Sequence, residues 1–197
     1  IFPKKVIEAH DAGICHQHDM DYMAQSTLHN CDLINLEDML QNGTVINNVR
    51  INKPHRLLTA MTVTTQIMAS VAANSYGGES ITLTHLAPFV RDSYNIFKNK
   101  YKDEDISDEL KEKFAMADLK KEIADSVQTF NYQISTLFTL NGQAPFCSLF
   151  MYIGETEEYK KELILLIEEF LKQREKGMPN RQGVYVTQAF PKLLYVL

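Results

Sequence analysis

The stretch ICHQHDMDYMAQSTLHNC, residues 14–31, gathers three histidines, two cysteines and two aspartates in one short span. His16 and His18 alternate with Gln17, so in an extended strand both imidazoles would point to the same face of a sheet. We expect a strand over residues 14–18, closed by Asp19. Because the carboxyl ends of strands open into the crevice where α/β proteins bind ligands, the stretch predicts a functional site in an α/β fold.

Two other interpretations of this cluster remain open. A histidine beside an aspartate is often structural, since the carboxylate fixes the tautomer of the imidazole and neither group reacts. His-x-His is also a common metal-ligand pair, and His16 and His18 could serve a metal-dependent hydrolase of the amidohydrolase type. Such a hydrolase needs further ligands downstream, and no other histidine lies in an obvious strand-end context.

Length and composition limit the class of protein. A chain of 197 residues that is 45% hydrophobic fits one domain, or half of a larger one, with a sizeable core. Its net charge of -5 argues against a surface that binds polymeric nucleic acid, because there is no basic excess to neutralise phosphates. Cys15, Cys31 and Cys147 form no CxxC pair, so neither a disulfide framework nor a zinc motif is indicated. We expect a reduced, cytoplasmic setting.

Helix and strand signals alternate along the rest of the chain. Asn35 and Ser107 are typical N-caps followed by acids, and Gly177 suits a helix end. Strands separated by helices predict a parallel or mixed sheet with crossover connections. We expect helices at residues 3–12, 35–42, 87–97, 107–140 and 156–176, one opening at Pro54, strands at 146–153, 184–186 and 193–197, and a strand or hairpin at 44–51.

Two long stretches carry no charge, residues 57–78 and 126–154. The first contains too many threonine, serine and asparagine residues for a membrane span. A helix that is polar but uncharged is expected to be buried on several sides, either in the core of the chain or at an interface with a partner. The pattern does not choose between these two burial modes.

Several longer strings then follow each other along the chain: HQHDMDY, HNCDLINLEDMLQNGTVI, KPH, TQIMASVAANSYGG, HLAPFV, NGQAPF and GVYVTQAFPKLLYVL. In this order they resemble the anaerobic (class III) ribonucleoside-triphosphate reductases, which are glycyl-radical enzymes. The resemblance implies that residues 1–197 form the N-terminal half of the catalytic domain, the first half of a ten-stranded α/β barrel. The family's thiyl-radical loop, radical glycine and ATP-binding cone have no counterpart here, so the fragment itself is expected to be inactive.

The same resemblance assigns expected roles near the start of the chain. Cys31 matches the cysteine that lies beside the substrate ribose and takes part in reducing the radical intermediate. Asn30 would hydrogen-bond a ribose hydroxyl. His16, His18 and Asp19 would line the same cavity. Cys15 is expected to be an ordinary strand residue and Cys147 a structural one.

The family also dimerises through two helices per subunit, which the uncharged stretches 57–76 and 126–140 resemble. A specificity site for deoxynucleotide effectors lies at the edge of that interface, and Gln66, Asn131 and Gln133 are the candidate contacts. The implied partners are ribonucleoside triphosphates, the effectors, a second copy of the chain and an iron-sulfur S-adenosylmethionine activase that installs the glycyl radical, with formate as reductant. No metal or cofactor is expected in this segment. A non-catalytic nucleotide-binding dimerisation module is a further alternative.

Overall fold

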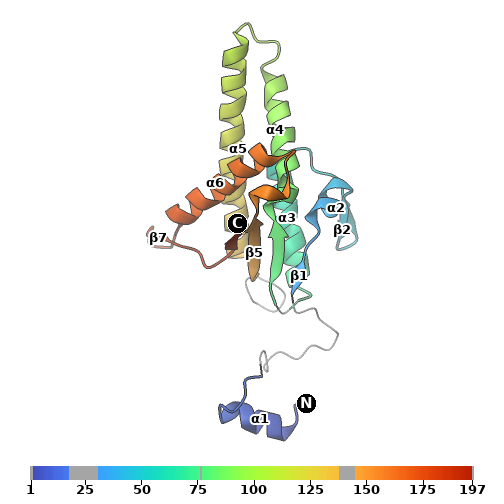
Figure 1. Ribbon diagram of the computed structural model, residues 1–197, viewed down its shortest axis with the longest axis vertical. Coiled ribbons are helices and arrows are strands. Elements are labelled where there is room, and N and C mark those ends of the chain that lie inside the picture. The colour runs from blue at the N-terminus through green and yellow to red at the C-terminus, as the bar shows by residue number, and fades with distance from the viewer. Residues whose placement is uncertain (1, 18–30, 76, 138–144, 197) are drawn as a thin grey trace.

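A four-stranded parallel sheet organises the computed structural model, which describes residues 2–17, 31–75, 77–137 and 145–196. The sheet order is β1 (Asp32–Leu33), β4 (Glu79–Thr82), β5 (Cys147–Met151) and β8 (Lys192–Tyr195), and every pairing is parallel. Helices lie in each connection between successive strands, as parallel pairing requires. The predicted parallel sheet with helical crossovers is confirmed (Figure 1).

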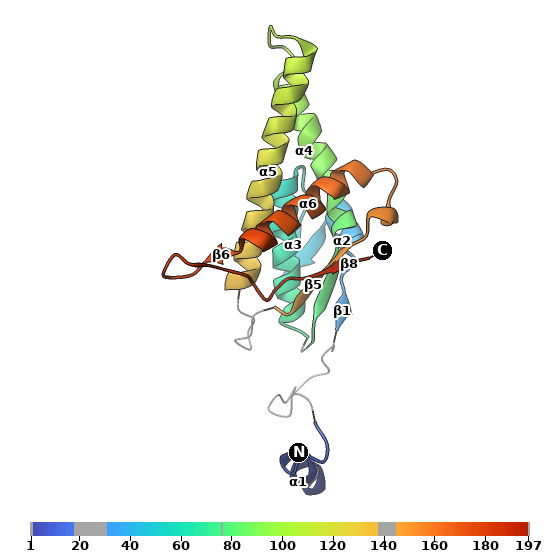
Figure 2. The same ribbon diagram turned by 60° about the vertical axis from the view of Figure 1, so that its left-hand side comes forward.

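The helices are long relative to the strands, and α4 and α5 run together well beyond the sheet (Figures 1 and 2). Two short antiparallel hairpins, β2 with β3 and β6 with β7, lie outside the sheet. The bounds are α1 Lys4–Asp11, α2 Leu36–Gln41, β2 Thr44–Ile46, β3 Val49–Ile51, α3 Leu57–Ala72, η1 Leu83–Leu86, α4 Ala87–Lys100, α5 Asp108–Thr136, η2 Ile153–Glu155, α6 Lys160–Lys176, β6 Met178–Pro179 and β7 Tyr185–Val186.

Local capping explains where several helices begin and end. Asn35 Oδ1 accepts a hydrogen bond from the Asp38 N–H at 3.4 Å, and Ser107 Oγ accepts one from the Leu110 N–H at 3.4 Å. Gly177, with φ +72°, ends α6 in a backbone conformation that residues other than glycine rarely adopt. These three signals were predicted and are confirmed. The helix expected from residue 156 begins later, at Lys160.

The strand predicted over residues 14–18 is wrong for the part that the structure describes. Gly13 has φ +68° and turns the chain back, so that the N–H groups of Ile14 and Cys15 donate to the Ala9 carbonyl at the end of α1. Backbone groups bonded to a helix end cannot join a sheet ladder. Cys15 is therefore exposed in a turn and is not a strand residue.

The core lies between the sheet and one layer of helices. Ile81, Cys147 and Leu149 point from β4 and β5 into this layer and are fully buried. Phe130 of α5 packs edge to face on Phe170 of α6, with ring centroids 5.6 Å apart. Because successive strand residues alternate between faces, Ser80, Thr82 and Phe150 point to the opposite side, which the described helices leave open (Figure 2).

The uncharged helix α3 is packed mainly within the chain. Its buried positions include Met61, Ile67 and Met68, which join the core, whereas Gln66 is exposed. A buried carboxylate, Glu122 of α5, fixes the start of α3, because Arg56 donates to both of its oxygens at 3.0 and 2.8 Å. Across the described ranges, no helix combines the length and apolar character that a membrane span requires.

Candidate active site

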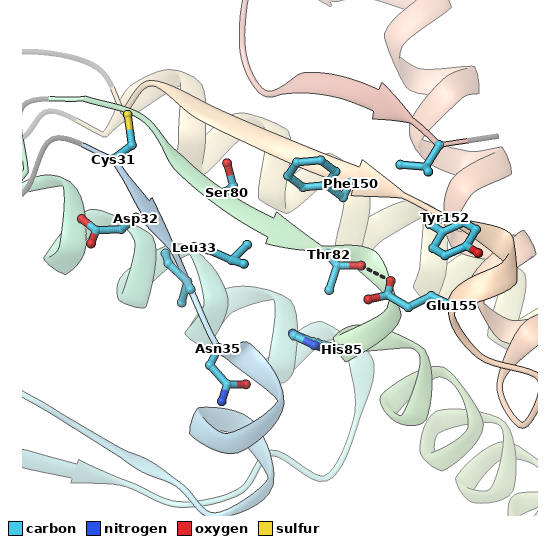
Figure 3. Close-up of a pocket in the computed structure, with 12 residues that line it drawn as sticks. Cys31, Asp32, Leu33, Asn35, Ser80, Thr82, His85, Phe150, Tyr152 and Glu155 are labelled. Atoms are coloured by element: carbon cyan, nitrogen blue, oxygen red, sulfur yellow. Dashed lines mark hydrogen bonds between the residues drawn. The ribbon is translucent and has the colours of Figure 1, made fainter.

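The open face of the sheet carries a hollow with a volume of about 720 Å³ (Figure 3). Side chains from β1, β4 and β5 and from the segments that follow them surround it, together with Cys31 directly before β1 and Val196 after β8. Its end at Thr82 and Glu155 lies at the carboxyl ends of β4 and β5, which is where α/β proteins bind ligands. The described residues that line it are Cys31, Asp32, Leu33, Ile34, Asn35, Ser80, Thr82, His85, Phe150, Tyr152, Glu155 and Val196.

Cys31 lies at one end of the hollow, directly before β1. The N–H of the next residue, Asp32, donates to the Gly78 carbonyl at 3.1 Å, which fixes this part of the chain beside the start of β4. The Cys31 side chain is exposed. Cys147, in contrast, is buried in the core, and burial raises the pKa of its thiol to about 12.

A carboxylate held by two hydroxyls lies at the other end of the hollow. Glu155 Oε2 accepts a hydrogen bond from Thr82 Oγ1 at 2.6 Å (Figure 3) and another from Thr84 Oγ1 at 2.5 Å. Thr82 ends β4, Thr84 lies in the 3-10 turn after it, and Glu155 ends the turn after β5. The side chain of Glu155 therefore joins the carboxyl ends of two neighbouring strands.

His85 completes this end of the site. Burial lowers the pKa of its imidazole, and the nearby charges of Glu37 and Glu155 oppose that shift only in part. Its Nδ1 atom is buried and has no hydrogen-bond partner within the described chain. The lowered pKa favours the uncharged form of the ring. From the sequence, His85 was set aside as a metal ligand because no strand was expected before it. Glu155 and its threonine partners were missed because no local pattern predicts the short strand β4.

The structure separates His16 from the hollow. His16 lies just after α1, where its ring centroid is 5.4 Å from that of His10, and it does not line the pocket. His18, Asp19 and Asn30 lie outside the described residues, so their predicted roles stay predictions. Among the described residues that were predicted to meet substrate, Cys31 lines the hollow and His16 does not.

The three effector candidates do not meet in one place of this chain. Gln133 of α5 accepts a hydrogen bond from the Thr65 hydroxyl, so it packs on α3 next to the residue that precedes the exposed Gln66 in the sequence. Asn131 is two positions earlier on α5 and therefore points to a different side of the helix. It donates to Gln173 of α6 at 3.3 Å.

No group of three or more histidine, cysteine or acidic side chains suited to a metal ion occurs among the described residues. That search does not extend to His18 and Asp19. The hydrolase interpretation therefore gains no support from the part of the chain that is described.

The sheet and its hollow define an α/β protein with a ligand crevice on one face of parallel strands. A family model described as anaerobic ribonucleoside-triphosphate reductase matches residues 1–197, and the chain belongs to this family. The anaerobic ribonucleoside-triphosphate reductase of Escherichia coli (strain K12) is 36% identical over 199 residues, which cover 100% of this chain and 27% of that protein. The chain thus spans about a quarter of the length of this curated relative.

Two crystal structures of the anaerobic ribonucleotide reductase from Thermotoga maritima share the fold. The one in complex with dATP and CTP has a TM-score of 0.63 and 17% identity, and covers 88% of this chain and 30% of that one. The one with dATP bound in the specificity site has a TM-score of 0.66 and 17% identity, and the match covers 98% of this chain and 32% of that one. Both confirm the α/β fold with its parallel sheet.

Proposed function

We propose that this chain is the N-terminal half of the catalytic barrel of an anaerobic ribonucleoside-triphosphate reductase, the enzyme that converts ribonucleoside triphosphates to deoxyribonucleoside triphosphates. The observation that carries the proposal is the position of Cys31, in a chain matched to the family from end to end, at the rim of a hollow on the open face of the sheet. The activity belongs to the complete protein.

The chemistry assigned to this half is the delivery of hydrogen from the Cys31 thiol to a ribose radical, with formate as the overall reductant. A thiol suits this step because its S–H bond is weak enough to give a hydrogen atom to carbon. The glycyl radical, installed by an iron-sulfur activase, and the thiyl-forming cysteine are assigned to other parts of the enzyme. Asn30 would orient the ribose by a hydrogen bond.

The open face of the sheet supports the assignment to half of a barrel. Parallel sheets are almost always covered on both faces, yet Leu33 of β1 is 76% exposed and Leu194 of β8 is 41% exposed. A second half-barrel would bury these side chains and close the hollow around the substrate. We therefore assign residues 1–197 to the first half of the domain.

The α3–α5 surface is the proposed site of dimer formation and of deoxynucleotide binding. Gln66 of α3 and Thr136 of α5 are exposed and uncharged, and side chains of this kind can be buried without a charge desolvation cost. The Thermotoga maritima enzyme binds dATP in a specificity site, which motivates a nucleotide at this edge. Gln66 and Gln133 are the proposed contacts on this surface, and Asn131 would reach an effector only from the α5–α6 side.

The decisive experiment replaces Cys31 by serine in the complete reductase. Serine is nearly isosteric, so fold and assembly should persist, whereas an O–H bond is too strong to give its hydrogen to a carbon radical. We expect deoxynucleotide formation to fall below detection when it is measured anaerobically with formate and activase. Cys15→Ser is the matched control, because it also removes an exposed thiol, and it should keep wild-type turnover. Normal turnover by Cys31→Ser would refute the assignment.

The dimer proposal needs a variant on the surface and not in the core. Met68 is fully buried inside the single chain, so Met68→Asp would unfold the chain and say nothing about the interface. Gln66→Asp instead places a charge on the exposed face of α3. We expect it to weaken self-association about tenfold or more in sedimentation experiments, with an unchanged melting temperature at concentrations where the wild type is also a monomer. Association that is unaffected by Gln66→Asp would place the interface elsewhere.

A further inference from the structure

The backbone at the start of β4 holds the segment that follows Cys31. The Gly78 carbonyl accepts a hydrogen bond from the Asp32 N–H at 3.1 Å, and the Ser80 carbonyl accepts one from the Ile34 N–H at 2.9 Å. Cys31 directly precedes the first of these donors and lies at the rim of the hollow (Figure 3). A shift of this part of β4 therefore carries Cys31 with it.

Glu79 lies between these two carbonyls, and its side chain points to the helix-covered face of the sheet, where it is 1% exposed. The Ser75 hydroxyl, just after α3, donates to its Oε1 at 2.8 Å. The other carboxyl oxygen, Oε2, is buried and has no hydrogen-bond partner among the described residues. The Glu79 side chain thus ties β4 to the end of α3, and one of its oxygens is left unsatisfied.

The surroundings of this carboxyl group disfavour a negative charge. Its register neighbours are Asp32 of β1, which is acidic, and Cys147 of β5, whose thiol pKa is raised to about 12 by burial. No residue of α3 is charged, and Arg174 of α6 donates to two backbone carbonyls instead. Burial raises the pKa of Glu79, the hydrogen bond from Ser75 opposes the shift, and the charge of Asp32 adds to it.

We propose that Glu79 is a positioning residue for Cys31: its uncharged carboxyl group holds the start of β4 against the end of α3, and its ionisation displaces the backbone that carries Cys31. A charged Oε2 requires a hydrogen-bond donor, and no described residue supplies one. The start of β4 must therefore move toward solvent to satisfy it. The proposal rests on the proposed function, since it takes Cys31 to be the reductive thiol.

The first test measures deoxynucleotide formation by the complete, activated reductase as a function of pH. Glu79→Gln imitates the uncharged acid, because its amide oxygen can accept the hydrogen bond from Ser75 and the charge is removed. We expect similar kcat values at the acidic end of the range, and a wild-type kcat that falls several-fold below that of the variant as the pH rises through the raised pKa of Glu79. KM should be unchanged, since Glu79 is not among the described residues that line the hollow.

The second test observes Cys31 without turnover. The rate of alkylation of Cys31 is measured at the same pH values in the complete reductase before radical activation, for the wild type and for Glu79→Gln. The ratio of the two rates should be near one at acidic pH and should change several-fold where the kcat values diverge. Cys15 is the internal control, because it is exposed at the end of α1 and should react equally in both proteins. Normal turnover by Cys31→Ser would end the reductive role of Cys31 and leave this readout unaffected.

Ser75→Ala separates a proton-dependent role from a purely structural one. The Ser75 hydroxyl favours the charged form of Glu79, so its removal should raise the pKa of Glu79 further. The decline of kcat should therefore move to higher pH in this variant. Glu157→Gln is the matched control, because it removes the charge of a side chain that is 80% exposed and pairs with Lys160, and it should keep the wild-type pH profile.

Two outcomes would overturn the proposal. If the ratio of the wild-type kcat to that of Glu79→Gln is the same at every pH, Glu79 contributes only to stability. If Ser75→Ala leaves the decline of kcat in place or moves it to lower pH, another group causes that decline. The second outcome decides the question even where Glu79→Gln does not fold.

Discussion

The two faces of the sheet have different surroundings, although the same four strands form both. On the helix-covered face, Ile81 and Leu149 are fully buried and contribute to packing. On the open face, Ser80, Thr82 and Phe150 surround a hollow whose polar groups converge on two ends. Because strand side chains alternate, one residue packs in the core and the next residue of the same strand faces the hollow. Substitutions on one face should change stability, and those on the other should change binding.

The largest difference between the two faces should be in the reactivity of their cysteines. Cys147 is fully buried and its thiol pKa is raised to about 12, so it needs an opening of the fold to react, whereas Cys31 is exposed. We expect alkylation of Cys147 to be slower by about three orders of magnitude or more at pH 8, since opening costs several kcal/mol. Peptide mass spectrometry after timed alkylation measures both rates. Comparable rates would mean that Cys147 is not protected by the core.

Leucine truncation on the two faces is the next largest contrast. Leu149→Ala deletes a fully buried side chain and should lower the free energy of unfolding by about 2 to 5 kcal/mol. Leu33→Ala removes a side chain that is 76% exposed, and the cost should stay within about 0.5 kcal/mol. Urea denaturation of the isolated chain gives both values. In the complete reductase the cost of Leu33→Ala should rise, and an unchanged small cost there would argue against a second half-barrel on this face.

A buried acid gives the smallest effect, and one that depends on pH. Glu79 is 1% exposed, and burial raises the pKa of its carboxyl, a shift that the charge of Asp32 reinforces and a hydrogen bond from Ser75 opposes. The folded state therefore holds this proton more tightly than the unfolded state. Its stabilising contribution is present below the unfolded pKa and is lost as the pH rises through the higher folded pKa.

Glu79→Gln should remove that pH dependence. We expect the wild type to lose stability relative to the variant as the pH rises from below the ordinary glutamate value of 4.5 toward neutrality. Thermal melting at a series of pH values, with the exposed Glu157→Gln as control, measures the difference. Parallel curves for wild type and Glu79→Gln would show that the Glu79 carboxyl titrates as it does in the unfolded chain.

Local signals allowed much of the fold to be predicted. The caps at Asn35 and Ser107, the helix end at Gly177 and the apolar strand at β5 act over a few residues of sequence, and each is confirmed. β4 was missed because ESIT is a short strand whose place at the centre of the sheet comes from its neighbours. The strand expected after Gly13 was wrong because a helix-end turn satisfies the backbone groups of Ile14 and Cys15.

The amino-acid sequence by itself determined the family and the alternation of helices and strands, and it singled out Cys31 as the candidate reductive thiol, since these depend on residue identity and order. Only the tertiary structure decided which side chains share the hollow with Cys31. Glu155 and Thr82 are 73 positions apart in the sequence, and no local pattern links them. They meet because parallel pairing aligns the ends of β4 and β5, and strand register is set by packing of the buried face.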